Sequence, residues 1–286
     1  MLRLSSVPEV RKLLVPMRMT GMTIGFVPTM GALHNGHLSL VNQAVKHNDF
    51  TVVSIFVNPA QFGPNEDFGR YPRSPDEDLQ LLQESGADAV FMPEVSEIYA
   101  AESPKIHFQL PEIGTILCGA TRPGHFEGVL MVVSRLFNII SPQKAYFGQK
   151  DYQQLQIITQ FTKETFSEVE IVPCAIVREN DGLAMSSRNR YLLPEERLQA
   201  TGIHQTLQAV KSKWLETNSI EDAIREGNGV LNNFRLLKKE YLEIMSADLR
   251  PVSSTRERAN PIALIAVTIG KTRLIDNMFL EKQPGD

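Results

Sequence analysis

PTMGALHNGH, residues 28–37, leads from an apolar predicted strand at residues 23–27 into a helix that we expect to begin near Leu38. The turn from a strand into a helix N-terminus exposes unpaired backbone N–H groups and the positive end of the helix dipole, which bind an anion without a lysine. Gly31 and Gly36 allow the main chain to approach that anion closely. The stretch therefore predicts a phosphate-binding corner.

Two histidines of this corner, His34 and His37, lie three residues apart on either side of Gly36. A single histidine near a helix start is more often a cap or a surface residue than a functional one. Here the spacing, the glycines and the position at the turn all favour function. The imidazoles can add hydrogen bonds that strengthen as charge builds on a phosphate in the transition state.

The pattern from residue 23 to residue 177 alternates strands with helices, which is typical of a mostly parallel sheet covered on both faces. The expected strands are residues 23–27, 51–57, 87–92, 144–147 and 169–177. Ser74 can cap a helix that Gly86 ends, and the apolar spacing of residues 128–140 predicts a buried helix. The sequence thus predicts an α/β, Rossmann-like domain.

The composition changes after residues 187–190. Two amphipathic helices are expected at residues 194–216 and 219–237, followed by strands at residues 241–247, 262–269 and 273–280, the last two joined by a Gly270-Lys271 hairpin turn. Consecutive helices followed by an antiparallel hairpin indicate a smaller α+β domain. We therefore expect two domains, residues 1–177 and 178–286, as the length of 286 residues also favours.

Composition excludes several classes of protein. The net charge is −4 with no basic run, which argues against a nucleic-acid partner. Cys118 and Cys174 lack CxxC spacing, so reduced, buried, inert thiols are expected. Residues 1–10 have no apolar core of signal-peptide type, and the longest apolar run, residues 262–269, is too short to span a bilayer. We expect a cytoplasmic protein that binds no membrane.

A second polar stretch, FGQKDYQQL at residues 147–155, also leads from a strand end into a helix start. Lys150 supplies a point charge suited to phosphate, whereas Asp151 is equally consistent with an acid that favours the dipole of its helix. The amides of Gln153 and Gln154 suit a substrate with hydroxyls and a carboxylate.

A third stretch, DGLAMSSRN at residues 181–189, follows the last strand of the alternating region, near the edge where such sheets bind ligands. Taken alone, a loop of serines and arginines is usually a turn. In this position Ser186, Ser187 and Arg188 could hold a triphosphate as its α–β bond breaks. At the domain boundary, the loop would let the second domain act as a lid that excludes water.

Three further groups of residues have either a structural or a functional role, and the sequence does not decide between the two. Asn58 and Gln61 follow the second strand and are either loop residues or, as their place beside the corner favours, substrate contacts. Arg122, in the glycine-rich loop at residues 119–128, either binds an anion or lies on the surface. The acids at residues 76–78 could assist a Mg²⁺ ion, but helix capping suits them better.

Seven motifs occur in order along nearly the whole chain: PTMGALHNGH, IFVNPAQF, RYPRS, RPGHFEG, FGQKDYQQL, DGLAMSSRN and RLIDN. Together they resemble the pantothenate synthetase (pantoate–β-alanine ligase) family. HNGH resembles the HxGH signature of the nucleotidyltransferase superfamily, which includes the class I aminoacyl-tRNA synthetases. MSSR resembles the partner loop in which those synthetases use lysines. Because serines stand here, positive charge must come from Lys150 and Arg188.

This resemblance implies ATP-dependent condensation of (R)-pantoate with β-alanine to pantothenate, a coenzyme A precursor, through a pantoyl adenylate, with release of pyrophosphate and AMP. It implies Mg²⁺ bridging phosphate oxygens, with ligands from the protein left unknown, and a homodimer formed largely through the N-terminal domain. It implies catalytic roles for His34, His37, Lys150 and Arg188, pantoate contacts from Gln61 and Gln154, and a β-alanine contact from Gln61. The implied ATP site consists of Met30, Gly31, Ala32, Leu33, His34, Asn35, Gly36, His37, Gly148, Gln149, Lys150, Asp151, Val177, Met185, Ser186, Ser187 and Arg188.

Two other functions are possible for such a sequence, and each predicts different residues. Another adenylyl- or cytidylyltransferase with the HxGH corner should lack Gln61 and Gln154 together and would release a dinucleotide-type product. A non-catalytic nucleotide-binding regulator predicts loss of His37, Lys150 or the Ser/Arg loop, and all are present. No arrangement typical of an enzymic nucleophile is evident, which suits a reaction between two bound reactants that needs positioning and charge stabilisation.

Overall fold

The computed structural model describes residues 1–64, 66–99, 107–110, 112–252 and 260–281. The chain divides into two compact units, Met1–Gln149 with Gln153–Ala175, and Lys150–Tyr152 with Ile176–Asp286. Two functional domains separated after residue 177 stay a prediction. The units differ from that expectation because the short segment Lys150–Tyr152 belongs with the C-terminal part of the chain.

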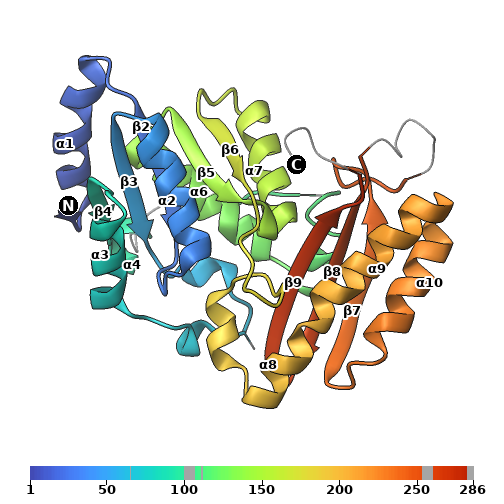
Figure 1. Cartoon of the computed structure of the whole chain (residues 1–286). Helices are drawn as coiled ribbons and strands as arrows, with labels where there is room; N and C mark the ends of the chain where they lie inside the picture. The colour runs from blue at the N-terminus through green and yellow to red at the C-terminus, as the bar shows by residue number, and fades with distance from the viewer. Residues whose placement is uncertain (65, 100–106, 111, 253–259, 282–286) are drawn as a thin grey trace. The chain divides into compact units, whose positions relative to one another are not determined.

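The first unit is built on a six-stranded parallel sheet with the strand order β1-β4-β3-β2-β5-β6 (Figure 1). Its strands are β1 Leu2–Leu4, β2 Ile24–Thr29, β3 Phe50–Ile55, β4 Ala89–Phe91, β5 Lys144–Gly148 and β6 Glu170–Cys174. The five expected strands are confirmed within three residues at each end. Strand β1, which the sequence did not predict, pairs with β4 at the edge of the sheet.

Helices connect these strands. They are α1 Val7–Met19, α2 Asn35–His47, α3 Pro75–Glu84, α4 Val95–Ile98, α5 Cys118–Thr121, α6 His125–Ile140 and α7 Tyr152–Glu164, with short 3-10 segments η1 Pro59–Gln61, η2 Phe68–Arg70 and η3 Gln149–Asp151. Helix α7 belongs to the first unit from Gln153 onward. Helix α6 contains the buried apolar residues that the sequence predicted.

Neighbouring residues of the central strand β2 point to opposite faces of the sheet. Val27 belongs to a buried cluster with Leu40 and Val41 of α2. Phe26 instead meets Phe137 of α6 edge to face, with ring centroids 6.3 Å apart. Because successive side chains of a strand alternate, α2 and α6 cover opposite faces of the sheet. The expectation of a parallel sheet covered on both sides is therefore confirmed.

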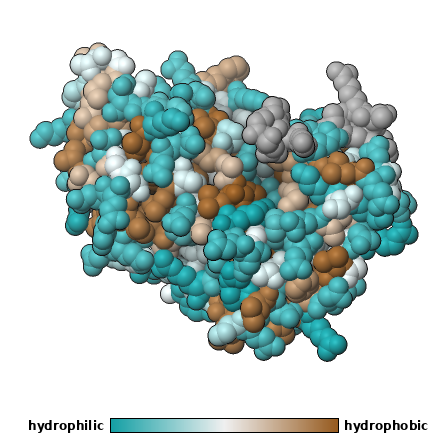
Figure 2. Space-filling view, viewed as in Figure 1, coloured by the Kyte–Doolittle hydropathy of each residue, from teal (hydrophilic) through white to brown (hydrophobic). Residues whose placement is uncertain are grey.

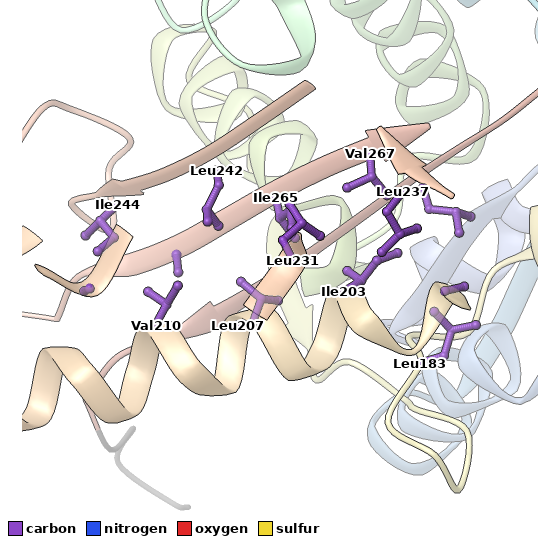
Figure 3. Close-up of a cluster of buried hydrophobic side chains, with 14 of the residues drawn as sticks. Leu183, Ile203, Leu207, Val210, Leu231, Leu237, Leu242, Ile244, Ile265 and Val267 are labelled. Carbon is purple, nitrogen blue, oxygen red and sulfur yellow. The ribbon is translucent and has the colours of Figure 1, made fainter. Parts of the chain in front are cut away.

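The second unit is an antiparallel sheet packed against helices. Strands β7 Leu237–Met245, β8 Ile262–Ile269 and β9 Thr272–Phe279 lie in that order, and η4 Ser187–Tyr191, α8 Pro194–Ala200, α9 Gly202–Thr217 and α10 Ile220–Leu231 precede them. In Figure 3, Leu207 and Val210 point from α9 toward the buried face of the sheet, where Ile265 and Leu242 lie. This unit is the α+β fold expected from the sequence.

Two boundaries in this unit differ from expectation. The helix expected at residues 194–216 is two helices separated at Thr201, because Thr201 and Gly202 are weak helix formers. The helix expected at residues 219–237 ends at Leu231, and β7 begins at Leu237, earlier than residue 241. Leu237 pairs with Ile269 of β8, a tertiary partner that local periodicity does not reveal.

The surface and the cysteines bear on what the composition indicated. No helix in the described ranges combines the length and apolarity needed to cross a bilayer. On the face seen in Figure 2, hydrophobic residues form small groups among hydrophilic ones. Cys118 and Cys174 are buried and are not joined in a disulfide, as expected. Burial raises the pKa of the Cys174 thiol to about 11, so it is a poor nucleophile at neutral pH.

Candidate active site

The order of the parallel strands reverses between β2 and β5, which are hydrogen-bonded neighbours. In open parallel sheets, ligands bind outside the carboxyl ends of the strands at such a point. The stretch at residues 28–37 leads from the end of β2 into α2, and Gly148 and Gln149 stand at the end of β5 (Figure 1). The corner predicted for phosphate therefore lies at the position where this type of sheet binds ligands.

The turn at residues 30–33 is held by one carboxylate. Gly31 and Ala32 have positive φ angles of 79° and 49°. The backbone N–H groups of Ala32 and Leu33 donate to the two carboxylate oxygens of Asp78, at 2.9 and 2.8 Å. A Cβ atom at Gly31 would lie 2.9 Å from the same carboxylate. Asp78 is buried in the first turn of α3 and fixes the left-handed conformation of this turn.

This contact corrects part of the expected chemistry. We expected unpaired N–H groups of the turn to bind an anion, but those of Ala32 and Leu33 donate to Asp78, and that of Gly31 donates to Thr29 Oγ1 at 3.2 Å. Asp78 was expected to cap its own helix or to assist Mg²⁺. Its position in the sequence, an acid in a first turn, gave no indication of a partner 45 residues away.

Ser74 occupies the N-cap position of α3, as expected, but its side chain does not bond to a backbone N–H there. Its hydroxyl donates to Asp78 Oδ1 at 3.2 Å. The capping residue thus supports the carboxylate that holds the corner.

His34 caps a helix, as one of its two interpretations predicted, and its functional role stays a prediction. Helix α2 begins at Asn35, three residues earlier than expected, and His34 is its N-cap. The backbone N–H of Gly36 donates to His34 Nδ1 at 3.1 Å. Because Nδ1 accepts, the neutral ring carries its proton on Nε2, which makes Nε2 a donor. The ring of His37 lies against that of His34, with centroids 4.1 Å apart, so both imidazoles belong to one site.

Gln61, the expected pantoate contact, is hydrogen-bonded to Met30 of the corner. Its Nε2 donates to Met30 Sδ at 3.2 Å, and its Oε1 accepts from Asn58 Nδ2 at 3.0 Å. Backbone groups fix the amide of Asn58, because Nδ2 donates to the Gly128 carbonyl at 3.0 Å and Oδ1 accepts from Ala60 N–H at 3.2 Å. The donor end of the Gln61 amide therefore faces the corner.

Two residues that support Asn58 were missed from the sequence. The hydroxyl of Tyr99 donates to Asn58 Oδ1 at 2.7 Å, and burial raises the pKa of Tyr99 to about 12, which keeps the hydroxyl protonated. A Cβ atom at Gly128 would lie 2.1 Å from the Ala60 carbonyl oxygen, so glycine there lets α6 lie on η1. No local pattern marks either contact. Asn58, left open above, thus positions Gln61.

The two glutamines at the start of α7 differ in role. Gln153 is buried, accepts from Cys118 N–H at 3.0 Å and donates to the carbonyls of Ile113 and Ile116 at 2.7 and 2.8 Å. It holds the chain before α5 in place. Gln154, the expected pantoate contact, is half-buried.

Arg122 binds a carboxylate of the protein itself, and a contact with substrate stays a prediction. Its Nε and Nη2 donate to the carboxylate of Glu66 at 2.7 and 2.6 Å. Burial raises the pKa of Glu66, whereas the hydrogen bonds and the charge of Arg122 lower it. The lowering effects are larger together, so the pKa of Glu66 is below its usual value. The guanidinium joins the loop before α6 to the segment after η1.

In the second unit, the segment DGLAMSSRN forms a tight hairpin followed by η4. Arg178 and Ala184 form an antiparallel bridge, and Met185 N–H donates to the carbonyl of Val177 at 3.0 Å. Ser186 Oγ accepts from Arg188 N–H at 3.3 Å and caps η4. The expected ATP contacts in this segment are thus held in one compact loop.

Ion pairs hold this hairpin at its base and along its side. Arg178 donates to both oxygens of Asp276, at 2.6 and 3.0 Å. Arg197 of α8 pairs with Glu179 and Asp181 at 2.6 and 2.7 Å. The hydrogen bond from Arg197 holds the pKa of Asp181 below its usual value.

Lys150 belongs to the second unit and lies in η3, where its Nζ is 3.4 Å from Asp151 Oδ2. Asp151, whose role was left open, is exposed and precedes α7. Within the described ranges, no three His, Cys, Asp or Glu side chains come together as a metal site.

The family model for pantoate–β-alanine ligase matches residues 3–279. The chain belongs to this family. A pantothenate synthetase of Fervidobacterium nodosum is 50% identical to this ligase over 91% of the chain and 92% of its own length, and one of Caldicellulosiruptor bescii is 46% identical over 98% and 99%. The resemblance inferred from the seven motifs is confirmed.

Solved structures of the family share the fold of the ligase. The pantothenate synthetase of Thermus thermophilus superposes with a TM-score of 0.93 at 42% identity, covering 99% of this chain and 100% of its own. The pantoate–β-alanine ligase of Francisella tularensis, crystallised in complex with β-γ ATP and β-alanine, gives a TM-score of 0.82 at 34% identity, with both chains fully covered.

Proposed function

We propose that this ligase condenses (R)-pantoate with β-alanine at the expense of ATP. The carboxylate of pantoate attacks the α-phosphorus, the bond to the β-phosphate breaks, and pyrophosphate leaves. The amine of β-alanine then attacks the acyl carbon of pantoyl adenylate, loses a proton, and AMP leaves with the electron pair of the broken bond. Membership of the family and the ligands of the Francisella enzyme support this reaction.

The contact between Gln61 and Met30 is the observation that carries the proposal. A thioether is a weak acceptor, so the amide donor of Gln61 is suited to a stronger one. A carboxylate or hydroxyl oxygen of pantoate held by Gln61 would lie next to the corner. Gln154 supplies the second pantoate contact that we propose, and Gln61 also contacts β-alanine after pyrophosphate has left.

We assign the phosphate contacts residue by residue. His34 and His37 stabilise charge on the phosphates at the corner, and Lys150 with Arg188 supplies the positive charge that the serines of MSSR do not. Holding two reactants in line and stabilising the departing charge is sufficient for this chemistry, because the attacking group belongs to the substrate.

Mg²⁺ enters as part of the ATP complex. Asp78, the acid of residues 76–78 nearest the corner, holds backbone N–H groups with both oxygens. We therefore assign most of the ligands of the ion to phosphate oxygens and water, which suits the preference of Mg²⁺ for an octahedral shell that retains water.

We also propose a cytoplasmic homodimer in which residues 178–286 act as a lid. Small-angle scattering with and without a non-hydrolysable ATP analogue tests assembly and closure together. A dimer of unchanged mass that becomes more compact with the analogue is expected. A monomer–dimer shift that depends on the nucleotide contradicts this division of roles.

A product assay tests the reaction itself. The ligase is incubated with Mg²⁺, ATP, pantoate and β-alanine, and AMP, pyrophosphate and pantothenate are quantified, with each substrate omitted in turn. Pantothenate and AMP in equal amounts, dependent on all three substrates, are expected. Without β-alanine, one equivalent of pyrophosphate per site is expected. Formation of ADP and phosphate instead would indicate an acyl phosphate and contradict the adenylate route.

A further inference from the structure

The RLIDN motif at residues 273–277 has no part in the chemistry described so far. It lies in β9, and two of its polar residues, Asp276 and Asn277, are each only 3% exposed. Buried polar groups are costly unless they are hydrogen-bonded, so their partners indicate what they hold in place.

Asn277 holds the segment that carries Lys150. Its Nδ2 donates to the backbone carbonyl of Lys150 at 3.0 Å. Two residues further on, the hydroxyl of Tyr152 donates to the carbonyl of Ala247 at 2.7 Å, and its ring meets Phe279 edge to face with centroids 5.5 Å apart. These contacts explain why Lys150–Tyr152 belongs to the second unit although it lies between β5 and the body of α7.

Asp276 holds the base of the hairpin that precedes residues 186–188. Both of its oxygens accept from Arg178, whose Nη1 also donates to the carbonyl of Gly182 at 3.0 Å. A two-point pair of arginine and carboxylate fixes direction as well as distance. The guanidinium therefore sets the hairpin in a single orientation on β9.

The two anchors are joined to each other. Arg178 Nη2 donates to the carbonyl of Asn277 at 3.3 Å, and the N–H of Asn277 donates to Asp276 Oδ1 at 2.8 Å. One dipeptide of β9 thus binds both the Lys150 segment and the Arg178 hairpin. These segments are far apart in the sequence, and each carries groups assigned to the triphosphate.

We propose that Asp276 and Asn277 are positioning residues that hold Lys150 and residues 186–188 as one phosphate-binding surface. The proposal rests on the assignment of ATP to these segments under the proposed function. Lys150 and Arg188 must meet the same triphosphate, and displacement of such a group by a fraction of its hydrogen-bond length weakens binding steeply. Because both segments are hydrogen-bonded to the same buried dipeptide, Lys150 and residues 186–188 cannot be displaced independently.

A merely structural role is the rival explanation, and the same sheet provides its control. Arg273 donates to both oxygens of Glu240 at 2.8 and 2.6 Å, joining β9 to β7. This pair has the chemistry of the Arg178–Asp276 pair, and its two hydrogen bonds join one strand to another. Asp276→Asn and Glu240→Gln are therefore matched substitutions.

The test measures the dissociation constants of Mg-ATP and of pantoate by calorimetry, and the melting temperature by circular dichroism. Asp276→Asn and Asn277→Leu should each weaken ATP binding about tenfold, a normal size for coupled residues, and change pantoate binding less than about twofold. Glu240→Gln should lower the melting temperature without weakening ATP binding. Should Asn277→Leu fail to fold, Asn277→Ser replaces it in the same measurements.

A double-mutant cycle with Lys150→Ala separates positioning from packing. If Asn277 acts through Lys150, Asn277→Leu should weaken ATP binding less than about twofold in the Lys150→Ala background. The full tenfold effect in that background, or an equal loss of ATP binding in Glu240→Gln, would overturn the proposal. If the native ligase binds ATP but makes no pantothenate, the proposed function is wrong. The double-mutant cycle still tests the positioning role, because it measures ATP binding alone.

Discussion

The corner of the first unit and the hairpin of the second are held in different ways. In the corner, the buried carboxylate of Asp78 accepts two backbone N–H groups, so the main chain itself is fixed. In the hairpin, ion pairs between side chains add to the backbone hydrogen bonds, and one pair, Arg197 with Asp181, is partly exposed. Removing a buried charged acceptor costs about 1–3 kcal/mol or more, whereas an exposed ion pair contributes about 0.2–1 kcal/mol.

This difference indicates which of the two regions tolerates amino-acid substitution. The corner depends on one residue whose loss leaves two buried donors without an acceptor. The hairpin has several anchors, and only the buried one at Asp276 resembles Asp78 in burial. We therefore expect substitution of Asp78, which holds the corner, to affect stability and activity together, and substitutions at the exposed side of the hairpin to affect neither strongly.

His37→Ala should have the largest effect. Loss of one donor that stabilises transition-state charge typically lowers the rate about 10²- to 10³-fold, and His37 is assigned that role. Quenched-flow measurement of pantoyl adenylate tests it, with a melting curve to show that the fold is intact. His47→Ala, at the exposed end of the same helix, is the control and should be near normal. Adenylate formation at the native rate in His37→Ala would remove His37 from the mechanism.

Asp78→Asn should have the second largest effect, on stability and turnover together. An amide has one oxygen, so either Ala32 or Leu33 loses its acceptor, which lowers the free energy of unfolding by about 1–3 kcal/mol. Displacement of the histidines should also lower kcat about tenfold. Urea unfolding and steady-state assays measure both. Asp76→Asn, exposed in the same helical turn, is the matched control. Equal stability of the two variants would refute the anchoring role.

Gln154→Ala should change substrate binding selectively. Loss of a neutral hydrogen bond weakens binding by up to about tenfold, so the KM for pantoate should rise by that factor while the KM for ATP changes little. Initial rates over a matrix of the two concentrations give both constants. Gln160→Ala, exposed on the same helix, controls for effects on α7. A larger rise in the KM for ATP would contradict the pantoate assignment.

Asp181→Asn should have the smallest effect. The hydrogen bond from Arg197 holds the pKa of Asp181 below its usual 3.8, so the pair stabilises the fold above that pH and loses its contribution as the pH falls through the lower folded-state pKa. The melting temperature should fall by no more than about 3 °C at neutral pH. Melting curves from pH 7 to strongly acidic pH should show the difference shrinking. A fall as large as that of Asp78→Asn would remove the contrast between the two regions.

Local signals in the sequence predicted most of the fold and the centre of the site. Glycines, a histidine pair and a strand-to-helix turn marked residues 28–37, and apolar spacing marked α6. Residues 1–22 were left without assignment, because β1 has only three residues and α1 contains Pro16. Short strands and interrupted helices give weak periodic signals, so their existence depends on packing.

The sequence by itself determined the α/β and α+β classes, the family and the residue types that can bind phosphate, because strand and helix periodicity and turn chemistry are local properties of the chain. Only the tertiary structure decided which groups hold the site. Asp78 meets the corner across 45 residues, Arg178 meets Asp276 across 98, and Asn277 meets Lys150 across 127. Such contacts form where packing brings distant backbone and side-chain groups together away from water, and no local pattern encodes their pairing.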